Sequence, residues 1–274
     1  MPTHHWLDVP GARLYYEVQG SGPVLMLIGH PMDNSGFAGI APLLANDYTV
    51  VTYDPRGFGN STIDDPNQDA EPDVIADEIR RVLEVVGGGP AHVFGSSGGA
   101  VTGLALATRY PTVVRTLIAH EPPLALVLPD AEEAERGNQA IYDTYRNEGI
   151  GAAWQRFAAF TGIAMRPQGA TPPDSAAQAR AVATGERFFA HSLLPITLYK
   201  PDLAVLRKPS PRIVIAAGAA SEGQYPHRTA AALAGLLGTA PIIFPGGHGG
   251  FGTDPEEFAA ILRGVLADRA PVAR

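Results

Sequence analysis

Short apolar runs alternate with amphipathic stretches over most of this 274-residue chain. Continuous apolar runs are typical of strands buried on both faces of a parallel sheet, whereas apolar positions three or four apart indicate helices. On this basis we expect buried strands at 24–28, 48–53, 91–94, 113–119, 212–217 and 241–244, and helices at 37–45, 71–86, 100–108, 225–237 and 255–267. The alternation predicts an α/β fold with a mostly parallel, doubly wound sheet of eight strands.

Two regions depart from this alternation. Near the start, two strand-like stretches flank Pro10-Gly11 and predict a β-hairpin over 6–9 and 13–18. From Pro122 to Leu206 strand-like runs are absent, and helical patterns at 131–148, 151–163 and 175–193 stand between proline- and glycine-rich breaks, of which 166–174 is expected to be the most mobile. We therefore predict a core of residues 1–121 and 207–274, with residues 122–206 inserted as a helical cap.

Composition narrows the classes of partner. The net charge is −8, from 20 basic and 28 acidic residues, and the absence of a basic run argues against nucleic acid and anionic membranes. No apolar run approaches the length of a membrane span, and no secretory signal is visible. The chain has no cysteine, and its eight histidines show no metal-binding spacing. We expect a cytoplasmic protein, a monomer or homodimer, that acts on a small molecule.

The segment Gly95-Ser96-Ser97-Gly98-Gly99 carries the clearest chemical signal. It lies between a predicted strand and a predicted helix, which is the context of the Gly-x-Ser-x-Gly nucleophile elbow of α/β-hydrolases. The flanking glycines allow a sharp turn that lifts the serine above the sheet. Ser97 is the predicted nucleophile, because Ser96 would require a glycine where Phe94 stands.

An activated serine needs a base and an acid that orients the base. His248 follows the last predicted strand in a glycine-rich loop, and the chain order of serine first and histidine last fits this fold. For the acid we favour Glu121 and keep Glu222 open. Glu121 stands at the end of the strand after the elbow helix, followed by two prolines, and Glu222 lies in the loop after strand 212–217, where most α/β-hydrolases carry their acid.

Two backbone N–H groups should stabilise the oxyanion. One belongs to Gly98, directly after the nucleophile. The segment Ile28-Gly29-His30-Pro31 resembles the family's His-Gly-x-Pro loop with Ile28 in place of the histidine, which makes the N–H of His30 the second donor. The His30 ring is expected either to be structural or to touch the substrate.

The resemblance to the α/β-hydrolases covers nearly the whole chain. The loop Asp54-x-Arg56-Gly57-x-Gly59-x-Ser61 looks like an architectural loop of that family. The elbow together with His120-Glu121-Pro122 resembles the zearalenone-hydrolysing lactonase branch, in which a glutamate after this strand is the triad acid. The resemblance implies a triad of Ser97, His248 and Glu121, but it does not identify the substrate.

These residues predict a serine hydrolase that cleaves an ester or lactone through an acyl-enzyme and needs no cofactor and no metal. Hydrolysis of a carbon–carbon bond by the same triad, and a ligand-binding protein on a hydrolase scaffold, remain as alternatives. The predicted cap is rich in aromatic residues, about half of which we expect in its own core. For substrate binding we select Trp154, Phe188, Phe189 and Tyr225, and we expect a neutral, hydrophobic ester or lactone.

Overall fold

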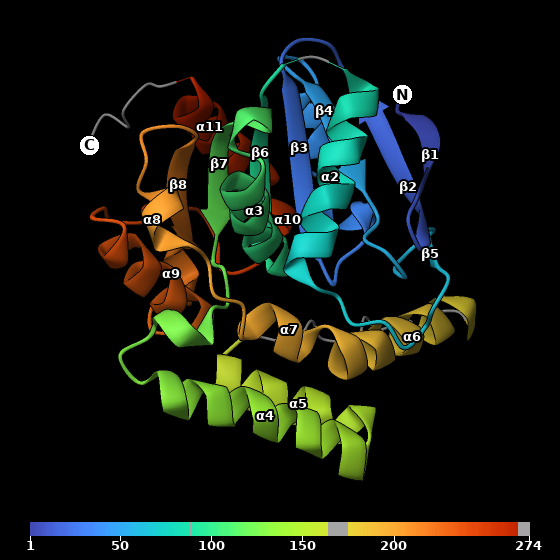
Figure 1. The fold of residues 1–274 in the computed structure, drawn as a ribbon, viewed down its shortest axis with the longest axis vertical. Coiled ribbons are helices and arrows are strands. Elements are labelled where there is room, and N and C mark those ends of the chain that lie inside the picture. Colours follow the sequence, from blue (N-terminus) through green and yellow to red (C-terminus); the bar gives the residue numbers. More distant parts are fainter. Residues whose placement is uncertain (88, 164–174, 268–274) are drawn as a thin grey trace.

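A computed structural model of the chain describes residues 1–87, 89–163 and 175–267. Within them, one sheet has the strand order β1-β2-β4-β3-β6-β7-β8-β9, and a short ninth strand, β5, pairs with β2 (Figure 1). The strands are β1 (Thr3–Val9), β2 (Ala12–Gln19), β3 (Val24–His30), β4 (Thr49–Tyr53), β5 (Thr62–Ile63), β6 (Ala91–Ser97), β7 (Val114–His120), β8 (Arg212–Gly218) and β9 (Ile242–Phe244). The predicted hairpin is β1 and β2, and the pairs from β4 to β9 along this order are parallel.

Helices cover both faces of the sheet, as the continuous apolar runs predict. One face packs against α2 (Pro72–Val86), α3 (Gly98–Arg109) and α9 (Tyr225–Leu236). The other face packs against α1 (Ala41–Leu44), α10 (Gly250–Thr253) and α11 (Pro255–Leu266). Within β3 the side chains alternate between the two cores, since Met26 belongs to the first and Leu25 and Leu27 to the second. Both faces of the sheet are therefore buried by helices.

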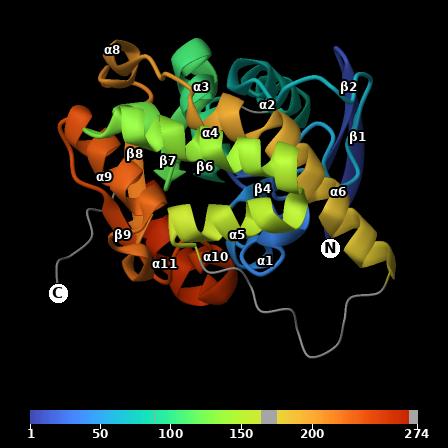
Figure 2. The same cartoon turned by 90° about the horizontal axis from the view of Figure 1, so that it is seen from below.

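A further set of helices lies beyond one end of the sheet (Figure 1). We call α4 (Ala131–Glu148), α5 (Ile150–Thr161), α6 (Ser175–His191) and α7 (Leu193–Thr197) the cap helices. Seen from below, α4 and α5 run side by side across the ends of the strands (Figure 2). Their bounds follow the predicted helices closely, although the pattern over 175–193 is divided between α6 and α7. The predicted loop 166–174 falls outside the described residues, and the division of the chain into core and cap remains a prediction.

The sequence pattern missed the shortest elements. The predicted helix 37–45 is a 3₁₀ turn, η1 (Asn34–Phe37), followed by the four-residue α1, which has a proline in its first turn. The helix α8 (Leu203–Leu206), α10, β5 and the 3₁₀ turns η2 (Pro111–Val113), η3 (Ala125–Val127) and η4 (Ala219–Ser221) were not predicted. Each is too short to show a hydrophobic period. In the described part of the chain, no helix is long and apolar enough to cross a membrane.

Candidate active site

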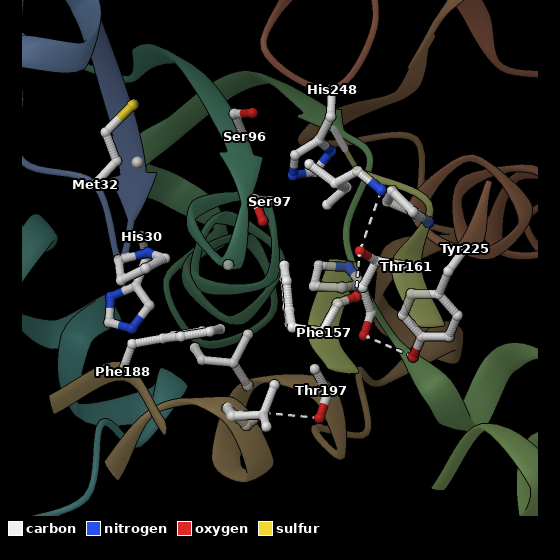
Figure 3. Close-up of a pocket in the computed structure, with 18 of the residues that line it drawn as sticks. His30, Met32, Ser96, Ser97, Phe157, Thr161, Phe188, Thr197, Tyr225 and His248 are labelled. Atoms are coloured by element: carbon white, nitrogen blue, oxygen red, sulfur yellow. Dashed lines mark hydrogen bonds between the residues drawn. The ribbon is translucent and has the colours of Figure 1, made fainter. Parts of the chain in front are cut away.

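The turn between β6 and α3 places Ser97 at the end of the central strand. Its backbone has φ 58° and ψ −127°, a strained conformation for a residue with a side chain. Gly95 and Gly99 have no room for a side chain, because a Cβ on Gly95 would lie 2.5 Å from the carbonyl oxygen of Gly99 and a Cβ on Gly99 would collide with the carbonyl of Ile28. The two glycines therefore allow the elbow, and Ser97 faces a pocket between His248 and His30 (Figure 3).

His248 and Glu121 meet across the same end of the sheet. The Nδ1 atom of His248 lies 2.7 Å from Oε2 of Glu121, although the two residues are 127 positions apart. Glu121 directly follows β7, has φ 50°, and donates its backbone N–H to the carbonyl of Ala216 at 2.9 Å. Nδ1 of His248 is thus occupied by the carboxylate, which leaves Nε2 as the ring nitrogen that can act as a base.

The second oxygen of Glu121 is also held. Oε1 accepts the backbone N–H of Gly218 at 2.9 Å and the hydroxyl of Ser221. The side chain is fully buried. Burial by itself raises the pKa of Glu121, but the hydrogen bond from His248, the charges of His120 and His248 and the hydroxyl of Ser221 lower that pKa to about 2. Glu121 is therefore an ionised carboxylate at neutral pH.

The alternative acid, Glu222, lies elsewhere. Its side chain is exposed, and it lines a separate surface hollow together with Asp130 and Arg228. It does not line the pocket that contains Ser97 and His248. The structure therefore brings His248 to Glu121 and leaves Glu222 at the surface.

The two predicted oxyanion donors lie at adjoining strand ends. His30 is the register partner of Ser97 in the parallel pair β3 and β6, and Gly98 begins α3. A Cβ on Gly98 would lie 3.0 Å from the carbonyl oxygen of His30, so this approach leaves little room for a side chain. The His30 ring packs edge-on against Phe58, with centroids 5.1 Å apart. Burial, reinforced by the charge of Arg187, lowers the pKa of His30 to about 3, so the ring is neutral.

A cavity of about 300 Å³ connects these residues with the cap helices. Its lining includes Ser97, His248, His30 and Gly98 from the sheet end. Most of the remaining surface is apolar, from Met32, Trp154, Phe157, Phe188, Leu193, Ile196 and Phe251. None of the described residues that line it is an acidic residue, a lysine or an arginine. Such a cavity fits a neutral, hydrophobic ligand.

Comparison with known proteins identifies the family. Residues 22–162 match the family described as alpha/beta hydrolase fold. An uncharacterized hydrolase, YraK, of Bacillus subtilis (strain 168) is 34% identical over 267 residues, which cover 95% of this chain and 94% of that protein. The chain belongs to the α/β-hydrolase fold family. It is a hydrolase of the α/β type.

Two further similarities concern named activities. A zearalenone hydrolase of Cladophialophora bantiana is 34% identical over 131 residues, which cover 43% of this chain and 46% of that protein. A thermophilic esterase from Thermogutta terrifontis superposes with a TM-score of 0.73 at 20% identity, covering 98% of this chain and 99% of that one. At that identity the second similarity shows the shared fold.

The Asp54 loop is architectural, as the α/β-hydrolase resemblance implies. The carboxylate of Asp54 accepts the backbone N–H groups of Asn34 at 2.8 Å and of Asn60 at 2.7 Å, so it holds two turns together. Arg56 is buried and pairs with Glu78 at 2.6 Å. None of these side chains lines the cavity.

One residue that we predicted to bind the substrate lies outside the cavity. Trp154, Phe188 and Tyr225 line the cavity, but Phe189 does not. Phe189 is fully buried among the cap helices, where its ring lies 4.6 Å from that of Trp154 and 5.8 Å from that of Tyr145. Neighbouring residues of a helix point about 100° apart. When Phe188 faces the cavity, Phe189 must therefore face the interior of the cap.

Sequence reasoning also missed cavity residues. Phe157 is one of the aromatic residues of the predicted cap, and it lines the cavity together with Asn138, Thr161 and Thr197, none of which the prediction includes. The amphipathic pattern of α4 could have pointed to Asn138. This residue is polar, yet it lies on the buried face of the helix together with Ala134 and Ile141. Within residues 1–87, 89–163 and 175–267, no group of three or more His, Asp or Glu side chains could hold a metal ion.

Proposed function

We propose that this protein hydrolyses an ester or lactone of a neutral, hydrophobic small molecule through an acyl-enzyme on Ser97. The observation that carries the proposal is the 2.7 Å contact between His248 and the buried carboxylate of Glu121, with His248 and Ser97 lining the same cavity. A serine, an imidazole and a carboxylate in this order form the triad that activates a serine hydroxyl.

The proposed reaction has two halves. Nε2 of His248 removes the hydroxyl proton of Ser97 as its oxygen attacks the carbonyl carbon, and the ionised Glu121 stabilises the imidazolium. The tetrahedral oxyanion accepts the N–H groups of His30 and Gly98. The carbon–oxygen bond then breaks, His248 returns the proton to the leaving alcohol, and a water molecule activated in the same way releases the acid and restores Ser97.

The cavity supports a neutral substrate. Because its described lining offers no acidic residue, lysine or arginine, a charged substrate would lose its hydration without gaining an ion pair. The rings of Trp154 and Phe188 are stacked, with centroids 5.7 Å apart, and form an apolar part of the cavity wall. The similarity to a zearalenone hydrolase supports a lactone among the candidates.

Turnover on a graded panel tests this function. We expect kcat/KM to rise from p-nitrophenyl acetate to butyrate and octanoate, and one or more macrocyclic or small-ring lactones to be opened. Ser97→Ala should abolish each activity while keeping the thermal unfolding midpoint. Failure to turn over any ester or lactone, or a preference for acetate over longer chains, would contradict the proposal. Cleavage of a diketone substrate alone would favour carbon–carbon hydrolysis instead.

A further inference from the structure

Two polar side chains interrupt the apolar wall of the cavity and touch each other. Asn138 on α4 and Tyr225 on α9 both line the cavity, and Nδ2 of Asn138 lies 3.1 Å from the hydroxyl oxygen of Tyr225. Only 1% of Asn138 and 5% of Tyr225 is exposed. Tyr225 lies on the opposite side of the pocket from His30 and Phe188, with Ser97 between them (Figure 3).

The hydrogen bonds of Asn138 leave its carbonyl free. Its amide nitrogen donates to the backbone carbonyl of Ala134 at 2.8 Å as well as to Tyr225. Because a backbone carbonyl can only accept, this contact fixes which end of the side chain is the NH₂ group. The Oδ1 atom then accepts no hydrogen bond from any residue that the structure describes. Oδ1 is not among the fully buried side-chain atoms that lack a partner, so this free acceptor is accessible from the cavity that Asn138 lines, where a ligand can supply the missing hydrogen bond.

The Tyr225 hydroxyl has spare capacity of the opposite kind. It accepts the hydrogen bond from Asn138, and its own proton points to the carbonyl of Pro123 over 3.4 Å. That distance is long for an O–H···O hydrogen bond. Burial raises the pKa of Tyr225 to about 12, so the hydroxyl keeps its proton at neutral pH and remains a donor. The pair therefore offers one good acceptor and one weakly used donor.

The two threonines of the cavity wall differ from this pair. The hydroxyl of Thr161 donates to the carbonyl of Phe157 at 2.8 Å and accepts the N–H of Ile163 at 3.2 Å. The hydroxyl of Thr197 donates to the carbonyl of Leu193 at 2.7 Å. Both protons are thus used within the helices. The carbonyl oxygen of Asn138 and the hydroxyl proton of Tyr225 therefore remain available to a ligand.

We propose that Asn138 and Tyr225 bind a hydroxyl group of the substrate at a distance from the scissile bond. Oδ1 of Asn138 accepts the proton of that hydroxyl, and the Tyr225 hydroxyl donates to its oxygen. A hydroxyl is the simplest neutral group that both donates and accepts, so it satisfies both residues at once. The inference rests on the proposed function and narrows its substrates to hydroxylated hydrophobic esters or lactones.

Matched substrate pairs test the assignment. Each macrocyclic lactone or p-nitrophenyl alkanoate would be compared with counterparts that carry one added hydroxyl group. The position of that hydroxyl differs from one counterpart to the next. In the wild type we expect kcat/KM to be at least about tenfold higher for the hydroxylated member of one or more pairs, because a site built for a hydroxyl rejects the analogue that lacks it. Asn138→Leu and Tyr225→Phe should each bring that ratio close to one by slowing the hydroxylated member.

The control is Thr197→Val, which removes a polar atom from the same cavity wall but should keep the ratio. A purely structural role would show as equal losses on both members of a pair with a lower unfolding temperature, and that result would overturn the inference. So would a wild type that prefers no hydroxylated member. Tyr225→Phe removes a single oxygen atom, so it tests the inference by itself if Asn138→Leu does not fold.

Binding measurements separate this inference from the function on which it rests. Calorimetric titration of Ser97→Ala with the same substrate pairs reports hydroxyl preference without turnover. If the wild type turns over none of the substrates, the proposed hydrolysis is wrong. The titration still tests the hydroxyl preference in that case. Equal affinities within every pair would overturn the hydroxyl site even in an active esterase.

Discussion

Ser221 donates a hydrogen bond from its hydroxyl to the Glu121 carboxylate, whose other oxygen accepts from His248. The two residues come from different loops, since Glu121 follows β7 and Ser221 ends the turn after β8. The Ser221 hydroxyl is fully buried and lies 2.9 Å from the carbonyl of Gly218. It therefore restrains the carboxylate from the side opposite His248.

Removal of that hydroxyl should slow the reaction without removing the triad. In Ser221→Ala, Glu121 loses one of its two donors on Oε1, and we expect kcat to fall about tenfold because one hydrogen bond to a charged group is lost. Steady-state kinetics on the best ester checks this. Glu222→Gln, one residue along the chain at the surface, is the matched control and should keep the wild-type kcat. An unchanged kcat in Ser221→Ala would show that Gly218 and His248 are enough to hold the carboxylate.

The identity of the acid has a sharper test. Glu121→Gln replaces a carboxylate by an amide of nearly equal size, so His248 loses both its preferred orientation and the stabilisation of its charged form. We expect kcat to fall by ~10³–10⁴, as when a triad acid becomes an amide. Circular dichroism confirms that the variant is folded. A small effect of Glu121→Gln together with a large effect of Glu222→Gln would return the acid to the loop after β8.

The same carboxylate should contribute to stability in a pH-dependent way. The pKa of Glu121 is lowered from its ordinary value of 4.5 to about 2 in the folded protein. A lowered pKa stabilises the fold fully above about pH 4.5, and this contribution is lost as pH falls toward 2. The difference in unfolding free energy between wild type and Glu121→Gln should therefore shrink on acidification from pH 6 to pH 3. A difference that stays constant or grows would contradict the assigned shift.

The nucleophile can be identified by covalent labelling. A fluorophosphonate should modify Ser97, because only a serine activated by a neighbouring base reacts readily with such a probe. Intact-mass analysis should show one adduct on the wild type and none on Ser97→Ala. Ser96→Ala is the adjacent control and should still be labelled. An adduct on Ser97→Ala would assign the reactive serine elsewhere.

The strand, turn and helix around Ser97 could be predicted from the sequence better than the residues that line the cavity, for physical reasons. A strand, a Gly-x-Ser-x-Gly turn and a helix form a local pattern, and the predicted strand 91–94 is the first part of β6, whereas the predicted helix 100–108 is the middle of α3. The choice between Glu121 and Glu222 depends on which carboxylate reaches His248 across the sheet. That contact joins residues far apart in the sequence, so no local sequence pattern predicts it. The cavity depends on helix rotation, and an error of one residue turns a side chain from the ligand to the interior.

Phe188 and Phe189 show the consequence of that rotation and can be tested as a pair. Phe188 lines the cavity and is 7% exposed, whereas Phe189 is fully buried in the cap. We expect Phe189→Ala to cost about 3–5 kcal/mol of unfolding free energy, the usual cost of an aromatic cavity, because no solvent or ligand can fill the space.

Phe188→Ala should behave differently, because its ring lines a space that the substrate enters. We expect a smaller loss of stability and a change in selectivity, with kcat/KM falling more on p-nitrophenyl octanoate than on acetate. Thermal unfolding and chain-length kinetics on both variants separate the two roles. The opposite result would be a change of chain-length selectivity in Phe189→Ala and none in Phe188→Ala. It would mean that Phe189, and not Phe188, faces the substrate.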